Sequence, residues 1–371
     1  MQKVYETKEQ PKFAFLVSVL ENKKDESQTR ELKGLCETLE LNIIAHEKIR
    51  VREKSSKFGI GTGKAQELSD KAAELKADLM VFDNNLSPSQ QRNWETLCGI
   101  PVLDRQEIII RIFADRASTR EAELQIKLAE LFYFLPRLTH KYIDLSRQRG
   151  GRYGTKGSGE TKFETDRRKI EKRIIQLEKE VEQVAKQRQM QRRQRQRNNI
   201  PVCAIIGYTN SGKSSLLNIL TGANVLAEDK LFATLDAVTR RFEPAPGTHV
   251  LLTDTVGFIR NLPHSLIKAF RSTLEEAALA DVLIHILDVS DPDIEANYET
   301  TLSVLRELSL NNENSQEIPM ITLLNKIDRL SENDENTIED LLNRFPDSIP
   351  FSVKKGIGLD VLKKKIISVV Q

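Results

Sequence analysis

The chain of 371 residues has few cysteines, few aromatic residues and no long apolar run. Its three cysteines, Cys36, Cys98 and Cys203, are widely spaced, which fits neither a disulfide framework nor a zinc site. No apolar run reaches the roughly 20 residues that a transmembrane helix needs, and the N-terminus lacks the apolar core of a secretory signal. We therefore expect no membrane span and no metal finger, and we expect the protein in the reducing cytoplasm.

The chain also has little net charge. Its 56 Lys+Arg residues stand against 54 Asp+Glu residues, a balance of +2 that by itself argues against a polyanionic partner. The distribution of charge reverses this argument. Between Arg147 and Arg197 there are 17 basic and 7 acidic residues, a net charge of +10, whereas the rest of the chain has a net charge of −8. Such asymmetry is typical of a segment that faces a polyanion.

The apolar pattern predicts an α/β protein in three parts: an N-terminal α/β domain (1–145), a glycine-rich loop with a basic helical arm (146–198), and a C-terminal P-loop domain (199–371). In the first part, short strands alternate with helices, which predicts a mostly parallel sheet. The strands are expected at 13–20, 78–82 and 101–103, the helices at 29–41, 65–76 and 88–97. A long helix from Ser118 to about Leu135 is expected to end before Pro136.

The middle part begins with Gly150–Gly159, which has five glycines in ten residues and is expected to be a loop. From Glu160 to Arg197 there is no Gly or Pro, and the apolar residues follow a heptad spacing that predicts a helix or helical hairpin arm. The heptad positions are Phe163, Ile170, Ile174, Leu177, Val181 and Val184. The end of the arm, Lys186–Arg197, has six basic and no acidic residues. Because aromatic residues are nearly absent there, we expect contacts with RNA phosphates rather than base stacking.

The third part contains a complete phosphate-binding loop. Apolar strands are expected at 202–206, 250–253, 282–287 and 320–324, with a short strand at 349–351 and a final helix at 359–370. The first strand is followed directly by the P-loop, and a helical run starts at Ser215. Lys213 is expected to reach the β- and γ-phosphates of a nucleotide, and the Ser214 hydroxyl to bind Mg²⁺. The residues expected to bind the nucleotide here are Gly207, Tyr208, Thr209, Asn210, Ser211, Gly212, Lys213, Ser214 and Ser215.

Three further motifs follow strands of this part. In the first, an acid at Asp254 can hold Mg²⁺ through water and the Gly257 amide can meet a γ-phosphate. In the second, the Asp328 carboxylate can accept two hydrogen bonds from guanine that adenine cannot offer, so the motif predicts a GTPase rather than an ATPase. The third follows the short strand at 349–351 and is placed to support the guanine base with a backbone amide. The motifs are Asp254-Thr255-Val256-Gly257, Asn325-Lys326-Ile327-Asp328 and Ser352-Val353-Lys354.

A switch that senses the γ-phosphate must lie between the P-loop and Asp254. Thr234 and Thr239 both have hydroxyls in this region, and we favour Thr234 as the second protein ligand to Mg²⁺. The expected catalytic residues are therefore Lys213, Thr234 and Gly257. The switch residues expected near the nucleotide are Phe232, Ala233, Thr234, Leu235 and Asp236.

Over most of its length the chain resembles the HflX family of ribosome-associated GTPases. The resemblance rests on the segments Gly61–Lys64, Asn85–Gln90, Gly150–Thr161, Glu164–Arg168, Leu231–Asp236, Asp254–Arg260 and Asn261–His264. It implies a cytoplasmic, monomeric GTPase with GTP/GDP and Mg²⁺ as cofactors, which binds the large ribosomal subunit and its rRNA and dissociates stalled or idle ribosomes. Departures from the family are Val353, where Ala is usual, and Ala237-Val238, where Pro-Thr is common. We also expect no domain after the final GTPase helix.

Two features bear on the mechanism. Phe258 occupies the place where many GTPases have a water-orienting Gln, so hydrolysis is expected to be slow alone and to be stimulated by ribosomes. Asn210 is the residue with which similar P-loop GTPases hold K⁺ near the phosphates, which makes K⁺ a further candidate cofactor.

Two other functions remain open at this point. The glycine loop Gly59–Lys64 could serve an ATP-driven RNA-remodelling enzyme, although no strand precedes it. Alternatively, the protein could be a non-catalytic RNA-binding adaptor in which GTP only locks the structure.

Overall fold

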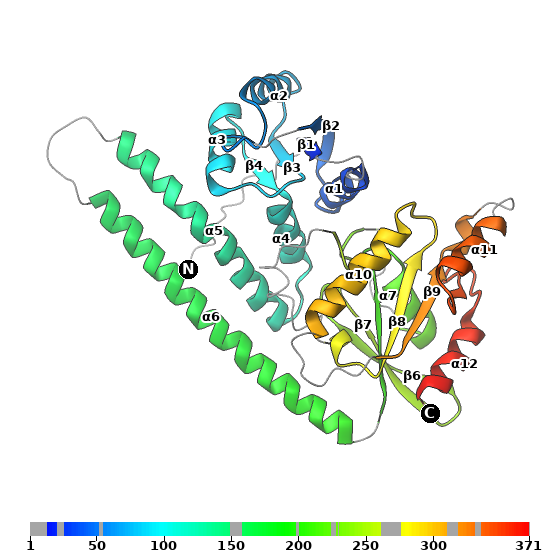
Figure 1. Ribbon diagram of the computed structural model, residues 1–371. Helices are drawn as coiled ribbons and strands as arrows, with labels where there is room; N and C mark the ends of the chain where they lie inside the picture. The colour runs from blue at the N-terminus through cyan, green and yellow to red at the C-terminus, as the bar shows by residue number, and fades with distance from the viewer. Residues whose placement is uncertain are drawn as a thin grey trace. The chain divides into compact units, whose positions relative to one another are not determined.

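The computed structural model describes residues 13–20, 26–51, 55–148, 158–197, 200–223, 228, 230–260, 276–309, 318–330 and 335–370. The chain forms two compact units, Met1–Asp115 with Ile126–Glu178, and Arg116–Gln125 with Lys179–Gln371. Each contains a sheet with helices (Figure 1). The predicted α/β class is confirmed, with an N-terminal α/β part, a helical middle and a C-terminal P-loop domain. The boundaries at residues 145 and 198 stay a prediction.

The sheet of the first unit has four parallel strands in the order β2-β1-β3-β4, as the alternating pattern predicts. The strands are β1 (Phe13–Leu20), β2 (Asn42–Arg50), β3 (Leu79–Phe82) and β4 (Val102–Asp104). The helices between and after them are α1 (Glu26–Thr38), α2 (Thr62–Glu74), α3 (Pro88–Cys98) and α4 (Arg105–Arg116). Pro88 lies in the first turn of α3, as expected, and Ser87 and Gln90 form a capping box there.

Two elements of this unit escaped prediction. Strand β2 pairs only with β1 and lies at the edge of the sheet, so it buries little of its length and carries polar residues. Helix α4 starts directly after β4 without a loop. The amide of Glu107 donates to Asp104 Oδ1 at 2.9 Å, so Asp104 caps the helix, and an Asp at this position was a usable start signal.

Helix α5 (Arg120–Gln148) runs through Pro136, so the prediction that it ends at Leu135 was wrong. Proline removes one helical hydrogen bond, but neighbouring contacts hold the turn. The Arg137 guanidinium lies 3.5 Å from the ring centre of Tyr133, donates to the Tyr133 carbonyl at 3.0 Å and pairs with Asp104 at 3.1 Å. Tyr133 lies one turn earlier in the same helix, whereas Asp104 is distant in sequence, so the local pattern could not reveal the pairing with Asp104.

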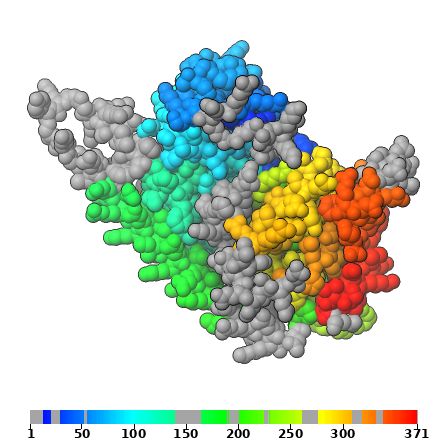
Figure 2. Space-filling view, viewed as in Figure 1, coloured from blue at the N-terminus to red at the C-terminus, as the bar shows by residue number. Residues whose placement is uncertain are grey.

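Helix α6 (Ser158–Arg197) is one continuous helix of 40 residues that runs alongside α5 in Figure 1. The predicted heptad stripe is its packed side, since Ile174 and Leu177 are buried and Ile170, Val181 and Val184 are half-buried. The opposite side is rich in long exposed side chains, which project outward in the space-filling view (Figure 2). The loop Gly150–Gly157 and the side chain of Phe163 lie outside the described residues.

The second unit has a six-stranded sheet in the order β10-β9-β8-β5-β7-β6, parallel except for β6. The strands are β5 (Val202–Gly207), β6 (Val238–Ala245), β7 (Thr248–Asp254), β8 (Val282–Asp288), β9 (Met320–Asn325) and β10 (Ile349–Pro350). The helices are α7 (Lys213–Thr221), α10 (Ile294–Ser309), α11 (Glu335–Arg344), α12 (Leu359–Val370) and the 3₁₀ turn Ile327–Arg329. Strand β6 was not predicted, because its first residues fall in the expected switch loop.

The core of this sheet positions the ends of the strands. Cys203, Ile205, Ile284, Ile286 and Leu323 are fully buried in one apolar cluster with α7 and α12. The carboxyl ends of the parallel strands therefore lie on one edge, where ligands of open α/β sheets bind. Within the described helices, none is long and apolar enough to cross a bilayer.

Candidate active site

The P-loop connects β5 to α7 and requires glycine at both ends. Gly207 has φ +149° and Gly212 has φ +105°. A Cβ on Gly207 would lie 2.4 Å from the Ile286 carbonyl oxygen, and one on Gly212 would lie 2.4 Å from Asn325 Nδ2. The loop therefore packs directly against β8 and the end of β9, and no side chain fits at either position.

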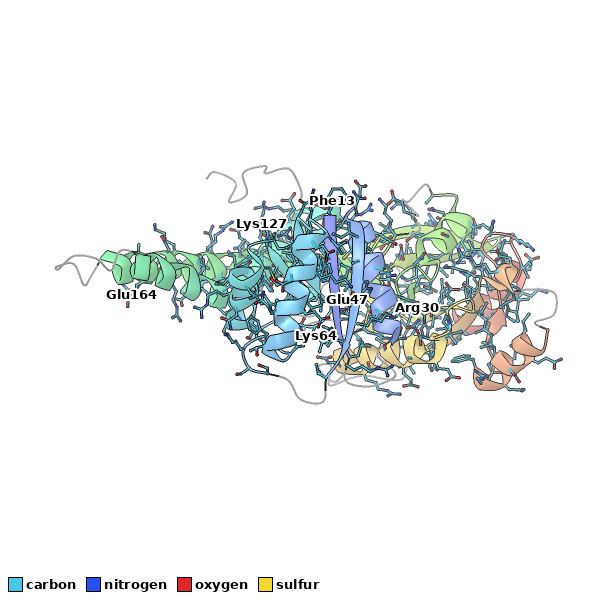
Figure 3. All side chains as sticks on the ribbon, turned by 90° about the horizontal axis from the view of Figure 1, so that it is seen from above. Phe13, Arg30, Glu47, Lys64, Lys127 and Glu164 are labelled. Carbon is cyan, nitrogen blue, oxygen red and sulfur yellow. The ribbon has the colours of Figure 1, made fainter. Side chains whose placement is uncertain are left out.

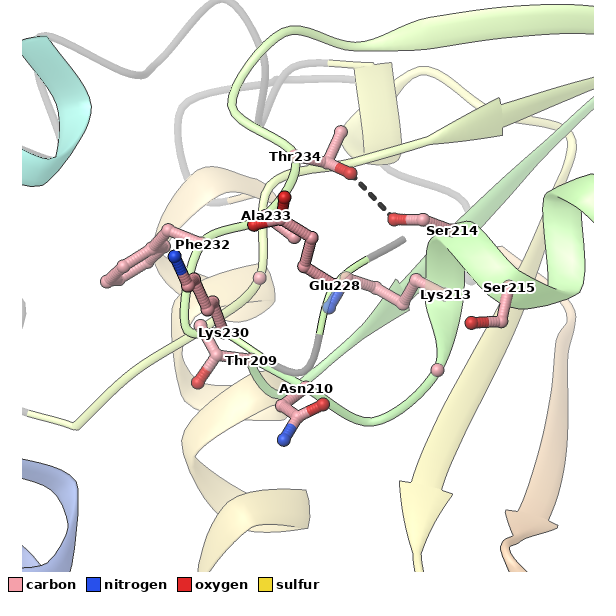
Figure 4. Close-up of a pocket in the computed structure, with 12 residues that line it drawn as sticks. Thr209, Asn210, Lys213, Ser214, Ser215, Glu228, Lys230, Phe232, Ala233 and Thr234 are labelled. Atoms are coloured by element: carbon pink, nitrogen blue, oxygen red, sulfur yellow. Dashed lines mark hydrogen bonds between the residues drawn. The ribbon is translucent and has the colours of Figure 1, made fainter. Parts of the chain in front are cut away.

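The interior of this loop presents unpaired polar atoms. The hydroxyls of Thr209 and Ser211 are buried and have no hydrogen-bond partner among the described residues. Buried hydroxyls without a partner are costly, so their position on a loop of backbone N–H groups fits an anionic ligand. An open pocket adjoins the loop, lined by Thr209, Asn210, Gly212, Lys213, Ser214, Ser215, Glu228, Lys230, Phe232, Ala233, Thr234 and Gly257 (Figure 4).

Lys213 is the buried cation of the site. Burial lowers the pKa of its ammonium to about 8, with the charge of Lys326 acting in the same direction and Asp254 opposing it. Its Nζ donates to the Tyr208 carbonyl at 2.7 Å. A phosphate in the pocket would provide a counter-ion for the buried ammonium of Lys213.

Three oxygens from separate elements meet beside the P-loop. The Ser214 hydroxyl donates to Asp254 Oδ2 at 2.7 Å, and since it has one proton, it accepts from the Thr234 hydroxyl at 2.6 Å (Figure 4). Asp254 is fully buried, and burial raises the pKa of its carboxyl. Its Oδ1 has no hydrogen-bond partner in the described part of the chain. Thr239 lies elsewhere, on β6, where its hydroxyl bonds to that of Thr253 at 2.9 Å.

The segment after Asp254 is fastened to the P-loop by its backbone. The Thr209 amide donates to the Phe258 carbonyl at 2.8 Å, and the Phe258 amide donates to the Gly207 carbonyl at 3.1 Å. A Cβ on Gly257 would lie 2.8 Å from Thr209 Cα. The Thr255 hydroxyl donates to the Ile205 carbonyl at 2.7 Å, and Val256 is buried. The ring of Phe258 is 1% exposed and belongs to the core.

The Asn325–Asp328 segment has two different tasks. Asn325 holds the loops together, because its Nδ2 donates to the Ser211 carbonyl at 2.8 Å and its Oδ1 accepts from the Val353 amide at 3.1 Å. Lys326 donates to the Asn210 carbonyl at 2.8 Å and pairs with Asp288 at 2.7 Å. Asp288, at the end of β8, was missed by sequence reasoning, although an acid at the carboxyl end of a buried strand was a usable signal.

Asp328 is half-buried and is prepared to accept hydrogen bonds. The Ser352 hydroxyl donates to its Oδ1 at 2.5 Å, and this bond, with the charges of Lys354 and Lys355, lowers the pKa of the carboxyl. The carboxylate is therefore ionised at neutral pH. Ile327 lies in the same turn, and its amide donates to the Phe351 carbonyl at 3.3 Å.

The remaining predicted switch residues lie close to the pocket. Phe232 and Leu235 are buried, and Phe232 and Ala233 line the pocket. Asp236 does not line it but bonds to Ser118 and Thr119, which precede α5. Asn261–His264 lies outside the described residues.

Fewer cations of the basic arm are available to an external polyanion than its composition indicates. Arg188 pairs with Glu121 of α5, so at least one cation of the segment has an acidic partner within the protein. The helix continues to Arg197, but the side chains of residues 191–197 lie outside the described part.

The glycine loop Gly59–Lys64 leads into α2 through a turn, without a preceding strand. Lys64, labelled in Figure 3, pairs with Glu67 of the same helix at 2.6 Å. No described residue lies within 4 Å of the positions where Gly61 and Gly63 would have a Cβ. This loop is a solvent-exposed start of a helix.

Comparisons with known proteins agree with the geometry of the P-loop domain. Family models match at three places: GTP-binding GTPase N-terminal at residues 26–114, GTP-binding GTPase Middle Region at 116–195, and 50S ribosome-binding GTPase at 202–326. GTPase HflX of Akkermansia muciniphila is 46% identical over 371 residues, covering 96% of this chain and 84% of that protein. The chain belongs to the HflX family of GTPases.

Further relatives extend this result. GTPase HflX of Escherichia coli is 39% identical over 306 residues, covering 82% of this chain and 70% of that protein. Among solved structures, the complex of SsGBP with GDP has 27% identity and a TM-score of 0.54, covering 97% of this chain and 98% of that one. As an HflX-family GTPase, the protein binds guanine nucleotides and hydrolyses GTP. The comparisons give no support to the ATP-driven alternative, and a non-catalytic adaptor does not fit a GTPase.

Proposed function

We propose that this GTPase depends on Mg²⁺, binds the large ribosomal subunit through its rRNA, and dissociates stalled or idle ribosomes. The observation that carries the proposal is the match of the P-loop domain to the 50S ribosome-binding GTPase model, together with the net charge of +10 between Arg147 and Arg197. A basic segment on an otherwise acidic chain favours contact with RNA phosphates. We also infer a cytoplasmic location and a monomer.

The oxygens around Ser214 fit Mg²⁺. Two hydroxyls, Ser214 and Thr234, lie 2.6 Å apart beside the unpaired Oδ1 of Asp254, and Mg²⁺ prefers such hard oxygen ligands. No cluster of three His, Cys, Asp or Glu side chains is present among the described residues, which favours a site completed by phosphate and water. We infer that Ser214 and Thr234 bind the ion and that Asp254 orients its water. Bound Mg²⁺ would neutralise charge on the phosphate oxygens.

Lys213 and Gly257 would act on the phosphates. Lys213, protonated when a nucleotide is bound, stabilises the charge on the β- and γ-phosphates, and the Gly257 amide donates to the γ-phosphate. Both groups line the pocket. Catalysis then consists of positioning and charge stabilisation, with water as the nucleophile.

The Asp328 carboxylate is proposed to select guanine. It would accept from N1–H and the exocyclic amine of the base, while Ser352 keeps it ionised. Asp328→Asn should weaken GTP binding by about 10- to 100-fold, because one acceptor becomes a donor facing a donor. Binding of XTP should improve, since xanthine has a carbonyl where guanine has the amine. Lys364→Ala, at an exposed position on α12, is the control, and equal losses for GTP and XTP would contradict the assignment.

Phe258 cannot orient the attacking water. Its ring is in the core and its side chain has no polar atom, so the free protein should hydrolyse GTP slowly. We infer that the ribosome supplies or orders the missing group. GTP turnover measured with and without large subunits tests this inference, and equal rates would overturn it.

Asn210 is the basis for a K⁺ site. It lines the pocket beside the phosphate loop and has φ +62°. A monovalent cation there would add positive charge near the transferred phosphate. We expect faster turnover in KCl than in NaCl at the same ionic strength, and Asn210→Ala should abolish the difference. Equal rates for the unaltered protein in the two salts would exclude a K⁺ site.

The basic end of α6 is proposed to contact rRNA. Replacing Arg192, Arg193, Arg195 and Arg197 by Gln should weaken ribosome binding and reduce the slope of log K against log salt by as much as about 3. The control replaces the lysines Lys363, Lys364 and Lys365 of α12 by Gln. An unchanged slope in the arginine variant would remove the arm from the interface.

The proposed outcome is tested by sedimentation of assembled ribosomes with the protein and either GTP or a non-hydrolysable analogue. Separation into subunits with both nucleotides would show that binding performs the work and that hydrolysis resets the protein. Intact ribosomes under both conditions would contradict the proposal.

A further inference from the structure

The switch segment is bound to the start of α5. Asp236 lies two residues after Thr234, and its carboxylate accepts four hydrogen bonds from the two residues that precede α5. The amides of Ser118 and Thr119 each donate to Oδ2 at 3.1 Å, the Ser118 hydroxyl donates to Oδ2 at 2.7 Å, and the Thr119 hydroxyl donates to Oδ1. All these residues belong to the same compact unit.

This contact uses the chemistry of a helix N-terminus. Thr119 caps α5, since its hydroxyl accepts from the Ala122 amide at 3.2 Å and its carbonyl accepts from the Glu123 amide at 3.0 Å. The free amides and the partial positive charge at that end favour a carboxylate. Because both oxygens of Asp236 are engaged, the contact fixes the orientation of the switch backbone as well as its distance from α5.

A second contact joins the same two segments. Arg116, at the end of α4, pairs at 2.8 Å with Glu228, which lines the nucleotide pocket. The segment 116–119 therefore meets residues on both sides of Thr234 along the chain. Between these two contacts, the Thr234 hydroxyl is held 2.6 Å from that of Ser214.

We propose that Ser118, Thr119 and Asp236 are positioning residues for GTP hydrolysis, and that they hold Thr234 where it meets Mg²⁺ and the γ-phosphate. The inference rests on the proposed role of Thr234. Ser118 and Thr119 lie in the Middle Region match and outside residues 202–326, which match the GTPase model. The catalytic switch of this protein is thus completed by a segment from outside its GTPase motifs.

The contact also makes α5 sensitive to the nucleotide. GTP favours the position of Thr234 that leaves Asp236 on α5, whereas GDP has no γ-phosphate to favour it. By linkage, a partner that binds the start of α5 more tightly when GTP is bound must tighten GTP binding by the same factor. Glu121 and Arg120, next along α5, pair with Arg188 and Glu180 of α6, so a partner that binds the basic end of α6 is connected to the switch.

The first test compares affinities for a non-hydrolysable GTP analogue and for GDP, both with Mg²⁺. Asp236→Asn and the double variant Ser118→Ala/Thr119→Ala should each weaken the analogue by about 3- to 10-fold and change GDP by less than about twofold. Thr119→Ser, which keeps the hydroxyl, should retain the normal ratio. The control is Glu243→Gln, whose carboxylate accepts from a turn amide, that of Gly247 at 2.7 Å, between β6 and β7.

Two outcomes distinguish failure of the positioning role from failure of the proposed role of Thr234. If Thr234→Ala lowers the ratio of analogue to GDP affinity but the Asp236 and Ser118/Thr119 variants leave it unchanged, the positioning role is refuted. If Thr234→Ala itself has no effect on the ratio, the proposed role of Thr234 fails.

The second test follows hydrogen exchange of the amides from Ser118 to Gln125. With the GTP analogue these amides should exchange more slowly than with GDP, and Asp236→Asn should abolish the difference. A merely structural cap would give the same protection with both nucleotides, and that result would overturn the proposal.

Discussion

Nucleotide binding by this protein should take up protons, because Lys213 must be charged in the complex but is only partly charged in the free protein. Burial lowers the pKa of its ammonium to about 8. A phosphate beside Nζ raises that pKa far above the range of the experiment. At pH 8 about half of the free protein has a neutral Lys213, so binding of GDP takes up about half a proton.

The same linkage fixes the sign and size of the pH effect on affinity. The bound state holds more protons than the free state, so binding weakens as pH rises through the pKa of the free protein. Between pH 7 and pH 8.5 the affinity for GDP should fall about fourfold. Burial holds the pKa of Cys36 and of Cys203 at about 12 and that of His285 at about 3, which keeps these buried groups out of the window.

Titration calorimetry of GDP binding at pH 8, in buffers with different ionisation enthalpies, measures this uptake directly. Asp254→Asn, measured without Mg²⁺, provides a second measurement of the proton uptake. The charge of Asp254 raises the pKa of Lys213, so its loss should lower that pKa and increase the uptake at pH 7.5. Binding that takes up no proton at pH 8 and has equal affinity at pH 7 and 8.5 would show a charged Lys213 in the free protein and refute the reasoning.

Three further variants test the packing of the site and of the two units. Gly257→Ala should lower kcat by about 100-fold or more with GDP affinity little changed, because its Cβ would lie 2.8 Å from Thr209 Cα on the γ-phosphate side. The control Gly61→Ala, where no described residue lies near the added Cβ, should leave turnover unchanged. Arg105→Ala should cost about 3–5 kcal/mol of stability in denaturant, since it leaves Glu31 and Asp83 buried without their cation. Arg167→Ala, at the exposed pair with Glu171, should cost less than about 1 kcal/mol. His285 is fully buried against Tyr298, and burial lowers its pKa from 6.5 to about 3, so the unfolded state binds the proton first as pH falls. Between neutral pH and pH 5 the free energy of unfolding should therefore fall by about 2 kcal/mol from this group. His285→Phe should remove that part of the loss.

The chemistry of the P-loop domain was largely readable from sequence because its motifs are local. Each places a few adjacent residues at the end of a strand, and strand ends of a parallel sheet meet on one edge. The strands before Gly207, Asp254 and Asn325 were recognisable as buried apolar runs, so the sequence predicted which motifs converge. It did not predict that Asn325 would tie the P-loop to Val353, since that contact depends on loop conformation.

Elements that failed prediction depend on distant partners. Strand β2 is polar because it lies at a sheet edge, and α5 continues through Pro136 because Arg137 reaches Tyr133 and Asp104. Spacing along the chain identifies neither the edge position of β2 nor the contact of Arg137 with Asp104. The same holds for Asp236, which sequence reasoning placed among the nucleotide contacts as part of a motif, whereas its carboxylate bonds to residues more than 100 positions earlier.

The position of Phe258 explains how the protein can dispense with a glutamine after Gly257 and still keep an ordered site. The residue exchanges two backbone hydrogen bonds with the P-loop, and its ring is anchored in the core. An anchored residue holds the Gly257 amide in place before a nucleotide arrives, so less ordering is required on binding. The site is thus preorganised around the phosphates, but the apolar ring of Phe258 cannot orient the attacking water. We therefore expect slow turnover of GTP until a partner completes the site, as the proposed ribosome-stimulated switch requires.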